Sequence, residues 1–470
     1  MRPAASVTRA ADPERLPPEQ TTRHTLEFPT RALTFAATAG AIRLTNDQNE
    51  PQADIAFIAY ALDGADPRAR PVTFVFNGGP GMASGWLQVG AIGPWRIPFT
   101  GGPSTHPEPQ PNPETWLEFT DLVFIDPPDT GYSRILSKND GTARRLLSVP
   151  GDVEVFAESI RRWLDRHDRI VSPKYLMGES YGGFRAPRLA RALQSTHGVG
   201  VTGIVLISPL LDVHTESGFN DPFNWSDRLP SMTAAARAMQ GPVTRADLTD
   251  VETYAKTGYL TDLVLGVRDK AAVARLTARV TALTGIDPAI VALGLGRLDN
   301  DVFLHELDRA RGRVGSIYDA TVTAPDPSPR DTRGLYSDPI LEGLSAPVTS
   351  AMVALYNGKL NWRPDAVYHL SSEQAFRQWD WGRSIGRPEA LTSLQSALAL
   401  NPRLNVLIAH GLFDLRTPYS TTARLLDQMP LADRVTLAVY PGGHMFYAND
   451  ASRAAFRDAG RKLYETKPAQ

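Results

Sequence analysis

Six short runs in this chain are uniformly apolar and lack the alternation of polar and apolar side chains that a half-exposed strand shows. They are residues 72–76, 122–125, 175–177, 204–207, 406–409 and 435–439. Strands with this pattern are buried on both faces, as in a parallel sheet covered by helices. Helical patterns at 152–166 and 184–194 lie between them. The sequence therefore predicts an α/β fold with a central, mostly parallel sheet and helices on both faces.

The six runs fall in two groups, four before Pro209 and two after Asn401. The segment 212–345 between them is rich in Ala, Leu and Arg at helical spacing, so we interpret it as a helical cap inserted into one sheet. The predicted core is then 31–211 and 346–470. Residues 1–30 are polar and contain prolines, which predicts a loose N-terminal arm, and antiparallel strands are expected at 33–39 and 55–62.

Composition excludes several classes of function. The 470 residues include 49 Lys and Arg against 51 Asp and Glu, a formal charge of −2, which gives no basic surface for nucleic acid or an anionic membrane. The absence of cysteine excludes disulfides, thiolate metal sites and a cysteine nucleophile. No apolar run suits a membrane span or a signal peptide, so we expect a soluble chain, either cytoplasmic or exported with its signal already removed. No metal or cofactor is expected, and oligomeric state is left open.

The strongest local motif is Gly178-Glu179-Ser180-Tyr181-Gly182, which follows one apolar run and precedes a helical pattern. A G-x-S-x-G between strand and helix is typical of a nucleophile elbow, in which a tight turn exposes the serine hydroxyl at a helix N-terminus. The alternative is an ordinary Gly-Ser turn. The strand before the motif and the helix after it favour Ser180 as a nucleophile.

A nucleophilic serine needs a base and a carboxylate that orients the base, and in this arrangement both follow the serine along the chain. The carboxylate is expected to end the strand before the histidine, and Asp414 does so in the stretch 410–414; His444 follows the last strand, directly after two glycines. We therefore predict Ser180, Asp414 and His444 as the catalytic residues. A surface or core histidine and a helix N-cap are the structural alternatives for these two, and His410 is the less favoured base.

Backbone donors for an oxyanion are expected in the segment Asn77-Gly78-Gly79-Pro80-Gly81, because its glycines leave N–H groups unobstructed after a strand. We predict the N–H groups of Gly79 and Tyr181 as the oxyanion hole. The alternative is a plain turn. A phosphate loop is excluded because no Gly-Lys-Ser/Thr follows.

Together these motifs resemble the signature blocks of the serine carboxypeptidases, in a bacterial-type form without cysteines. Besides the motifs already given, the blocks are Ile92-Gly93-Pro94, Ile125 to Ser133 (IDPPDTGYS) and Gly442-Gly443-His444-Met445. The likeness runs from about residue 70 to about 449 and is weakest in the cap. It implies an α/β-hydrolase fold, a Ser180-Asp414-His444 triad and removal of single residues from peptide C-termini, often at acidic pH.

The resemblance also implies a group that binds the free carboxylate of the substrate, here Asn77 and Glu179. A glutamate can contact a carboxylate when the two share a proton, which would link binding to low pH. The tryptophan of the family pattern is Val75 here, and its second glutamate falls at Ala91 or Ile92. The group is therefore incomplete, which keeps an esterase or acyltransferase open as the second reading and a decayed, non-catalytic site as the third.

Overall fold

The computed structural model describes residues 15–99, 107–137, 139–213, 218–330, 338–382 and 388–465. Its main element is a ten-stranded sheet with the strand order β1-β2-β3-β7-β4-β9-β10-β13-β14, and β8 pairs with β3 beside this path. The strands of this sheet are β1 Gln20–Phe28, β2 Arg31–Thr45, β3 Pro51–Leu62, β4 Val72–Phe76, β7 Asp121–Ile125, β8 Arg134–Ile135, β9 Lys174–Glu179, β10 Gly203–Ile207, β13 Asn405–Gly411 and β14 Val435–Tyr440.

From β7 to β14 each neighbouring pair in the sheet is parallel. The six uniformly apolar runs form these six strands, so the predicted mostly parallel sheet is confirmed. Full burial on both faces holds for β4, β7 and β10 and fails for β14, whose side chains are mostly half-buried. β14 is less buried because it is the last strand of the described sheet and pairs with a strand on one side only.

The N-terminal end of the sheet is an antiparallel meander of β1, β2 and β3. The expected loose arm over 1–30 is therefore wrong for residues 20–28, because β1 pairs with β2 along its whole length. Its side chains are mostly exposed or half-buried, as suits an edge strand, and this polar composition concealed the strand. Residues 1–14 of the expected arm lie outside the described residues.

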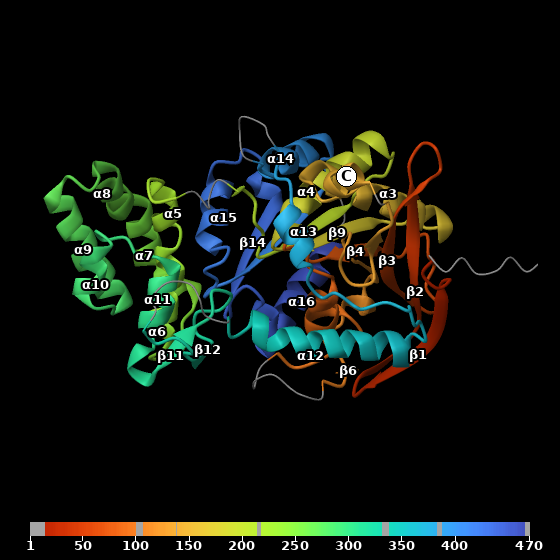
Figure 1. The fold of residues 1–470 in the computed structure, drawn as a ribbon, viewed down its shortest axis with the longest axis horizontal. Coiled ribbons are helices and arrows are strands. Elements are labelled where there is room, and N and C mark those ends of the chain that lie inside the picture. The colour runs from red at the N-terminus through yellow and green to blue at the C-terminus, as the bar shows by residue number, and fades with distance from the viewer. Residues whose placement is uncertain are drawn as a thin grey trace, which may run out of the picture.

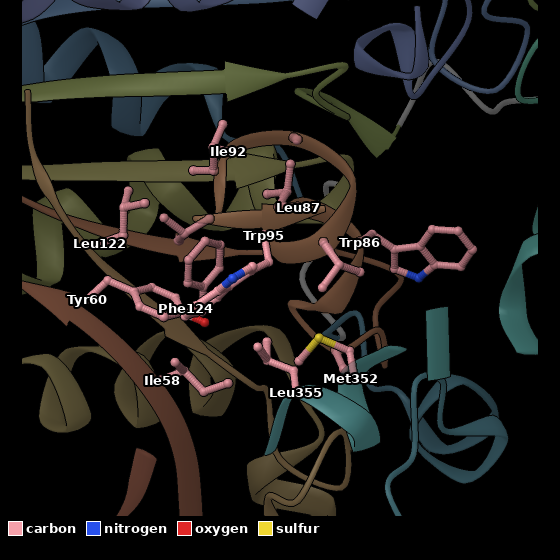
Figure 2. Packing of buried hydrophobic residues seen from close by; sticks show 14 of the residues in the cluster. Ile58, Tyr60, Trp86, Leu87, Ile92, Trp95, Leu122, Phe124, Met352 and Leu355 are labelled. Carbon is pink, nitrogen blue, oxygen red and sulfur yellow. The ribbon is translucent and has the colours of Figure 1, made fainter. Parts of the chain in front are cut away.

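Helices cover both faces of the sheet (Figure 1). One face packs against α3 Val149–Arg166, α4 Tyr181–Thr196 and α14 Leu391–Leu400, and the other against α12 Leu341–Ala354 and α16 Asp450–Glu465. Successive side chains of a strand point to opposite faces of the sheet. Phe74 therefore lies in the first core, between the sheet and α3, α4 and α14, and Val75 lies in the second core, between the sheet and α12 and α16. Figure 2 shows part of the second core, where Tyr60, Trp95 and Phe124 pack together.

Residues 222–325, the first part of the segment between β10 and β13, are largely helical and lie beside β14, away from β1 (Figure 1). Its elements are α5 Pro222–Ser226, α6 Leu229–Ala238, α7 Thr249–Tyr254, α8 Leu260–Leu265, α9 Lys270–Thr284, α10 Pro288–Leu293, α11 Asn300–Glu306 and the hairpin β11 Arg313–Gly315 with β12 Thr323–Pro325. They share an apolar cluster that residues 412–419 of the sheet region join. The predicted cap boundary at 345 falls inside α12, which packs on the sheet, so the division into domains stays a prediction.

Smaller elements complete the fold. They are α1 Gly85–Leu87, α2 Asp140–Leu146, α13 Glu373–Gln378, α15 Tyr419–Asp427 and the hairpin β5 Trp95–Arg96 with β6 Gln110–Pro111. No helix in the described ranges combines the length and the apolar character needed to cross a membrane.

Candidate active site

Four of the predicted site residues follow the carboxyl ends of strands in the parallel part of the sheet. Asn77 follows β4, Ser180 follows β9, Asp414 lies three residues beyond β13, and His444 lies four residues beyond β14. The carboxyl ends of parallel strands meet at the same edge of the sheet, which is where open α/β sheets bind ligands. The topology therefore gathers residues that are far apart in sequence at one edge.

Ser180 occupies the turn between β9 and α4, with φ 59° and ψ −120°. A non-glycine residue with this backbone conformation is strained, as expected of a nucleophile elbow. The turn is held by the N–H of Ser180, which donates to the carbonyl of Ile207 on the neighbouring strand at 2.9 Å. The serine is half-exposed while the strand before it and the helix start after it are buried. The structure therefore has the strand, tight turn and helix that the sequence predicts around Ser180.

His444 and Asp414 form a buried pair: His444 Nδ1 lies 2.8 Å from Asp414 Oδ2. The other carboxylate oxygen, Oδ1, accepts from the backbone N–H groups of Arg416 at 2.8 Å and Thr417 at 3.0 Å. Burial alone would lower the pKa of His444, but the charge and hydrogen bond of Asp414, together with the charge of Glu179, raise it above its ordinary value. The pair therefore fixes the ring and stabilises its protonated form.

The loop that carries His444 is fixed by a segment of the cap region. The N–H of His444 donates to the carbonyl of Tyr318 at 2.5 Å, and the ring of Tyr318 meets the imidazole edge-on, with centroids 5.4 Å apart. A Cβ at Gly443 would lie 2.0 Å from the same Tyr318 carbonyl, so glycine is required there. The cap region thus contributes to the position of the histidine.

His410, the rival base, points elsewhere. Its Nε2 lies 2.9 Å from the hydroxyl of Thr422, and burial lowers its pKa to about 4 even though Asp414 opposes this shift. His410 does not border the cavity that contains Ser180 and His444. Its geometry is that of a neutral core histidine.

The predicted oxyanion donors lie against the elbow. A Cβ built on Gly78 would be 2.4 Å from the backbone nitrogen of Tyr181, so the segment after β4 packs directly on the start of α4 because this position is glycine. Within the described ranges, neither the N–H of Gly79 nor that of Tyr181 makes a turn or loop hydrogen bond, and the first N–H groups of a helix have no partner within it. Both groups are available to a ligand.

Asn77 and Glu179 form a second buried group. Asn77 Nδ2 donates to Glu179 Oε2 at 3.1 Å, and the N–H of Leu87 donates to Asn77 Oδ1 at 3.2 Å, which fixes the direction of the amide. Burial raises the pKa of Glu179 to about 7, while His444, Tyr447 and Asn77 act in the opposite direction. The side chain is therefore able to hold a proton near neutral pH.

Two contributors were missed by the sequence reasoning. The hydroxyl of Thr417 lies 2.8 Å from Asp414 Oδ2 and 3.1 Å from His444 Nδ1. The hydroxyl of Tyr447 donates to Glu179 Oε2 at 2.9 Å. Each lies three residues after a predicted site residue. Proximity to Asp414 was a signal for Thr417, whereas nothing in the sequence links Tyr447 to Glu179, 268 positions away.

A cavity of about 600 Å³ brings these groups together, and its lining includes Asn77, Gly79, Glu179, Ser180, Arg416 and His444. Its walls come from the cap region at residues 317–318 and from 371–376. Val75, Ala91 and Ile92, where the resemblance implies a tryptophan and a second glutamate, are buried in the apolar core. Among the described residues no cluster of acidic or histidine side chains could hold a metal ion.

The elbow between β9 and α4, the glycine segment after β4 and the chain order Ser180, Asp414, His444 define an α/β hydrolase. Residues 35–257 match the family described as serine carboxypeptidase. The sequence is 25% identical over 170 residues to serine carboxypeptidase-like 13 of Arabidopsis thaliana, covering 36% of this chain and 39% of that protein. It is 29% identical over 171 residues to the carboxypeptidase Y homolog of Arthroderma benhamiae, covering 35% and 32%.

In these stretches the chain is similar to serine carboxypeptidases at low identity. The matched stretches span less than two fifths of either relative. Among solved structures, esterase E22 is similar with a TM-score of 0.40 and 13% identity, covering 95% of this chain and 100% of that one. The assignment to the α/β hydrolases rests on the topology and the elbow of this chain.

Proposed function

We propose that this protein is a serine carboxypeptidase that removes C-terminal residues from peptides through an acyl-enzyme on Ser180. The observation that carries the proposal is that Ser180, His444 and the Asn77–Glu179 pair border one cavity. Glu179 directly precedes Ser180 in the chain, so a group that holds the terminal carboxylate lies next to the nucleophile.

In the proposed reaction, Ser180 Oγ attacks the scissile carbonyl carbon while His444 accepts the hydroxyl proton. Asp414 holds the imidazole through Nδ1, so that Nε2 is the nitrogen that exchanges the proton with Ser180. The N–H groups of Gly79 and Tyr181 donate to the oxyanion. His444 then protonates the leaving amine, and a water molecule, activated by the same histidine, hydrolyses the acyl-enzyme.

The Asn77–Glu179 pair supplies the proposed exopeptidase specificity. The amide of Asn77 donates to the substrate carboxylate or to Glu179, and a protonated Glu179 donates its own proton to that carboxylate. An ionised Glu179 would repel it, because two like charges at contact cannot both persist. Binding of the free C-terminus is therefore expected to need the proton that burial keeps on Glu179.

The test compares three substrates that give the same acyl-enzyme: an N-blocked dipeptide with a free C-terminal carboxylate, its C-terminal amide, and the methyl ester of the N-blocked first residue. The proposal predicts that kcat/KM for the free acid is at least tenfold higher than kcat/KM for the amide. The reason is that the amide has no carboxylate to share a proton with Glu179. Equal hydrolysis of acid and amide would contradict exopeptidase specificity. No hydrolysis of any of the three would contradict the assignment to peptide and ester chemistry altogether.

The second candidate is an esterase or acyltransferase on the same scaffold. The observation in its favour is that Val75, Ala91 and Ile92 are apolar core residues, so the carboxylate-binding group lacks two partners of the family pattern. In the same assay this alternative predicts rapid turnover of the ester, little turnover of the free acid, and partition of the acyl-enzyme to an added alcohol or amine.

A further inference from the structure

The two oxygens of the Glu179 carboxyl group have different surroundings. Oε2 accepts two hydrogen bonds, from Tyr447 at 2.9 Å and from Asn77 at 3.1 Å. Among the described residues Oε1 has no hydrogen-bond partner, and it is not sealed in the interior as a buried unpaired atom. Because the side chain borders the catalytic cavity, Oε1 is the oxygen that a bound ligand meets.

Two donors on one carboxyl oxygen decide where a proton on this group resides. An oxygen that already accepts from a phenol and an amide cannot carry a hydrogen without displacing one of them, whereas the other oxygen can. We propose that Tyr447 is a positioning residue that, together with Asn77, holds Oε2 as the acceptor, so that Oε1 carries the proton and directs it at the terminal carboxylate of the substrate. This inference rests on the proposed carboxypeptidase function.

Tyr447 is well placed for this task. Its side chain is fully buried, and its ring packs against Phe99 and Phe446, with centroids 6.3 and 5.9 Å away. The contact with Glu179 in turn raises the pKa of the phenol further, after burial, so Tyr447 stays a neutral donor. It follows His444 by three residues, in the 3-10 turn Phe446–Ala448, so a single loop carries both His444 and the donor to Glu179.

The other titratable groups that face Glu179 are His444 and Asp414, from the loops after β14 and β13, and Tyr318 from the cap region. His444, when charged, favours the carboxylate, and Asp414 opposes it. Neither donates to Oε2, whose two donors are Tyr447 and Asn77. Removal of the Tyr447 hydroxyl is therefore expected to change the titration of Glu179 and to free Oε2 for the proton.

The first measurement uses the free enzyme and needs no substrate. Isotope-edited infrared spectra follow the protonated carboxyl band through a pH titration, and Glu179→Gln identifies the band that belongs to Glu179. Tyr447→Phe should raise the midpoint by on the order of half to one pH unit, because the carboxylate loses a donor. Tyr464→Phe is the matched control: it also removes a phenol hydroxyl, a half-buried one that bonds Thr73 at 2.6 Å, and it should leave the midpoint unchanged.

A second variant acts in the opposite direction and keeps the test valid if Tyr447→Phe does not fold. Site-specific 3-fluorotyrosine at position 447 has a more acidic hydroxyl, hence a stronger donor, and should lower the midpoint. A midpoint unchanged by either substitution would overturn the role of Tyr447. In kinetics, Tyr447→Phe should raise KM for a free-carboxylate peptide on the order of fivefold at pH 5, with less effect on kcat and on KM for the ester.

The two measurements separate the inference from the function on which it rests. The infrared midpoint could move while KM for the free-carboxylate peptide shows neither pH dependence nor a response to Tyr447→Phe. The proposal that Glu179 binds the substrate carboxylate would then be wrong, and so would the proposal that its proton is directed at that carboxylate. If KM of the native enzyme rises with pH but the midpoint is the same in native enzyme and Tyr447→Phe, the function stands and the role of Tyr447 is overturned.

Discussion

Asp414 and Glu179 are carboxyl groups at the same edge of the sheet, and both are buried, with exposed fractions of 0% and 3%. They differ in their donors. Asp414 accepts at both oxygens, from two backbone N–H groups at one and from Thr417 and His444 at the other. Among the residues that the structure describes, Glu179 has donors at Oε2 and none at Oε1. Because the burial is nearly equal, the different number of donors, rather than depth, supports the proposed roles of Asp414 in orienting the base and of Glu179 in carrying a proton.

The sources of the donors differ as well. Three of the four donors to Asp414 come from the turn that follows it, residues 416 and 417, so a short local segment builds most of that site. The donors to Glu179 come from segments 102 and 268 positions away. We therefore expect the Asp414 region to tolerate changes elsewhere in the fold better than the Glu179 region does.

The largest predicted effect comes from removing the group that both carboxyls are proposed to serve. Ser180→Ala should reduce kcat on the order of a millionfold, if serine, histidine and aspartate act as a unit, and should leave the fold intact because a half-exposed side chain loses one oxygen. Labelling with a fluorophosphonate followed by mass spectrometry checks the assignment. Modification at another serine, or at none in the native enzyme, would show that neither carboxyl serves Ser180.

Asp414→Asn breaks the orienting half of the comparison. The amide would present an N–H to His444 Nδ1 and favour the wrong imidazole tautomer, so kcat should fall by about 10⁴ with the fold retained. Asp427→Asn is the control, because Asp427 is exposed and pairs with Lys256 at the surface at 2.6 Å. A large loss in the control and a small one at position 414 would reverse the assignment of the acid.

Most of the sheet could be predicted because its signal is local. Each of the six parallel strands is a continuous apolar run, and burial on both faces requires that composition wherever the strand lies in the chain. β1 was missed because an edge strand exposes polar side chains. The cap boundary at 345, which falls inside α12, stays a prediction because helical spacing alone does not say which layer a helix packs on. Both depend on contacts that form only in the folded chain.

The same distinction holds for the site. Ser180, Asp414 and His444 could be proposed because the elbow and the strand ends have sequence patterns and a fixed chain order. Thr417 is close enough to Asp414 to have been considered. Tyr447 could not be foreseen, since its hydroxyl reaches Glu179 only because the loops after β9 and β14 meet at one edge of the sheet.

Thr417→Val tests how much of the Asp414 site depends on its one side-chain hydroxyl donor. The substitution removes the hydroxyl that contacts Asp414, His444 and, at 2.9 Å, the carbonyl of Ser208. Loss of one such hydrogen bond should lower kcat about tenfold. Thr422→Val is the matched control: it removes the hydroxyl beside His410 and should affect the free energy of unfolding without changing kcat. Equal losses in kcat from both would mean that the effect is structural.

Glu179→Gln tests the other half of the comparison, through pH. Burial raises the pKa of Glu179 to about 7, so its proton is present below that pH and lost above it. KM of the native enzyme for a free-carboxylate peptide should therefore be nearly constant from about pH 5 to about 6 and rise by about fivefold toward pH 8, somewhat less than the tenfold per pH unit that a fully required proton would give. We expect this smaller rise in KM because the carboxylate-binding group lacks the tryptophan and the second glutamate that the resemblance implies at positions 75 and 91.

In Glu179→Gln the amide donates without a titrating proton, so the rise in KM between pH 7 and 8 should disappear, whereas KM for the ester should change little in either enzyme. Glu373→Gln provides the control. Glu373 also borders the cavity, but it is exposed and pairs with Arg377, so this variant should keep the alkaline rise. If KM of the native enzyme is constant over this range, or if both variants lose the rise equally, then Glu179 is not the proton carrier. The esterase or acyltransferase alternative would then account better for a cavity in which one carboxyl group orients the base and the other is merely buried.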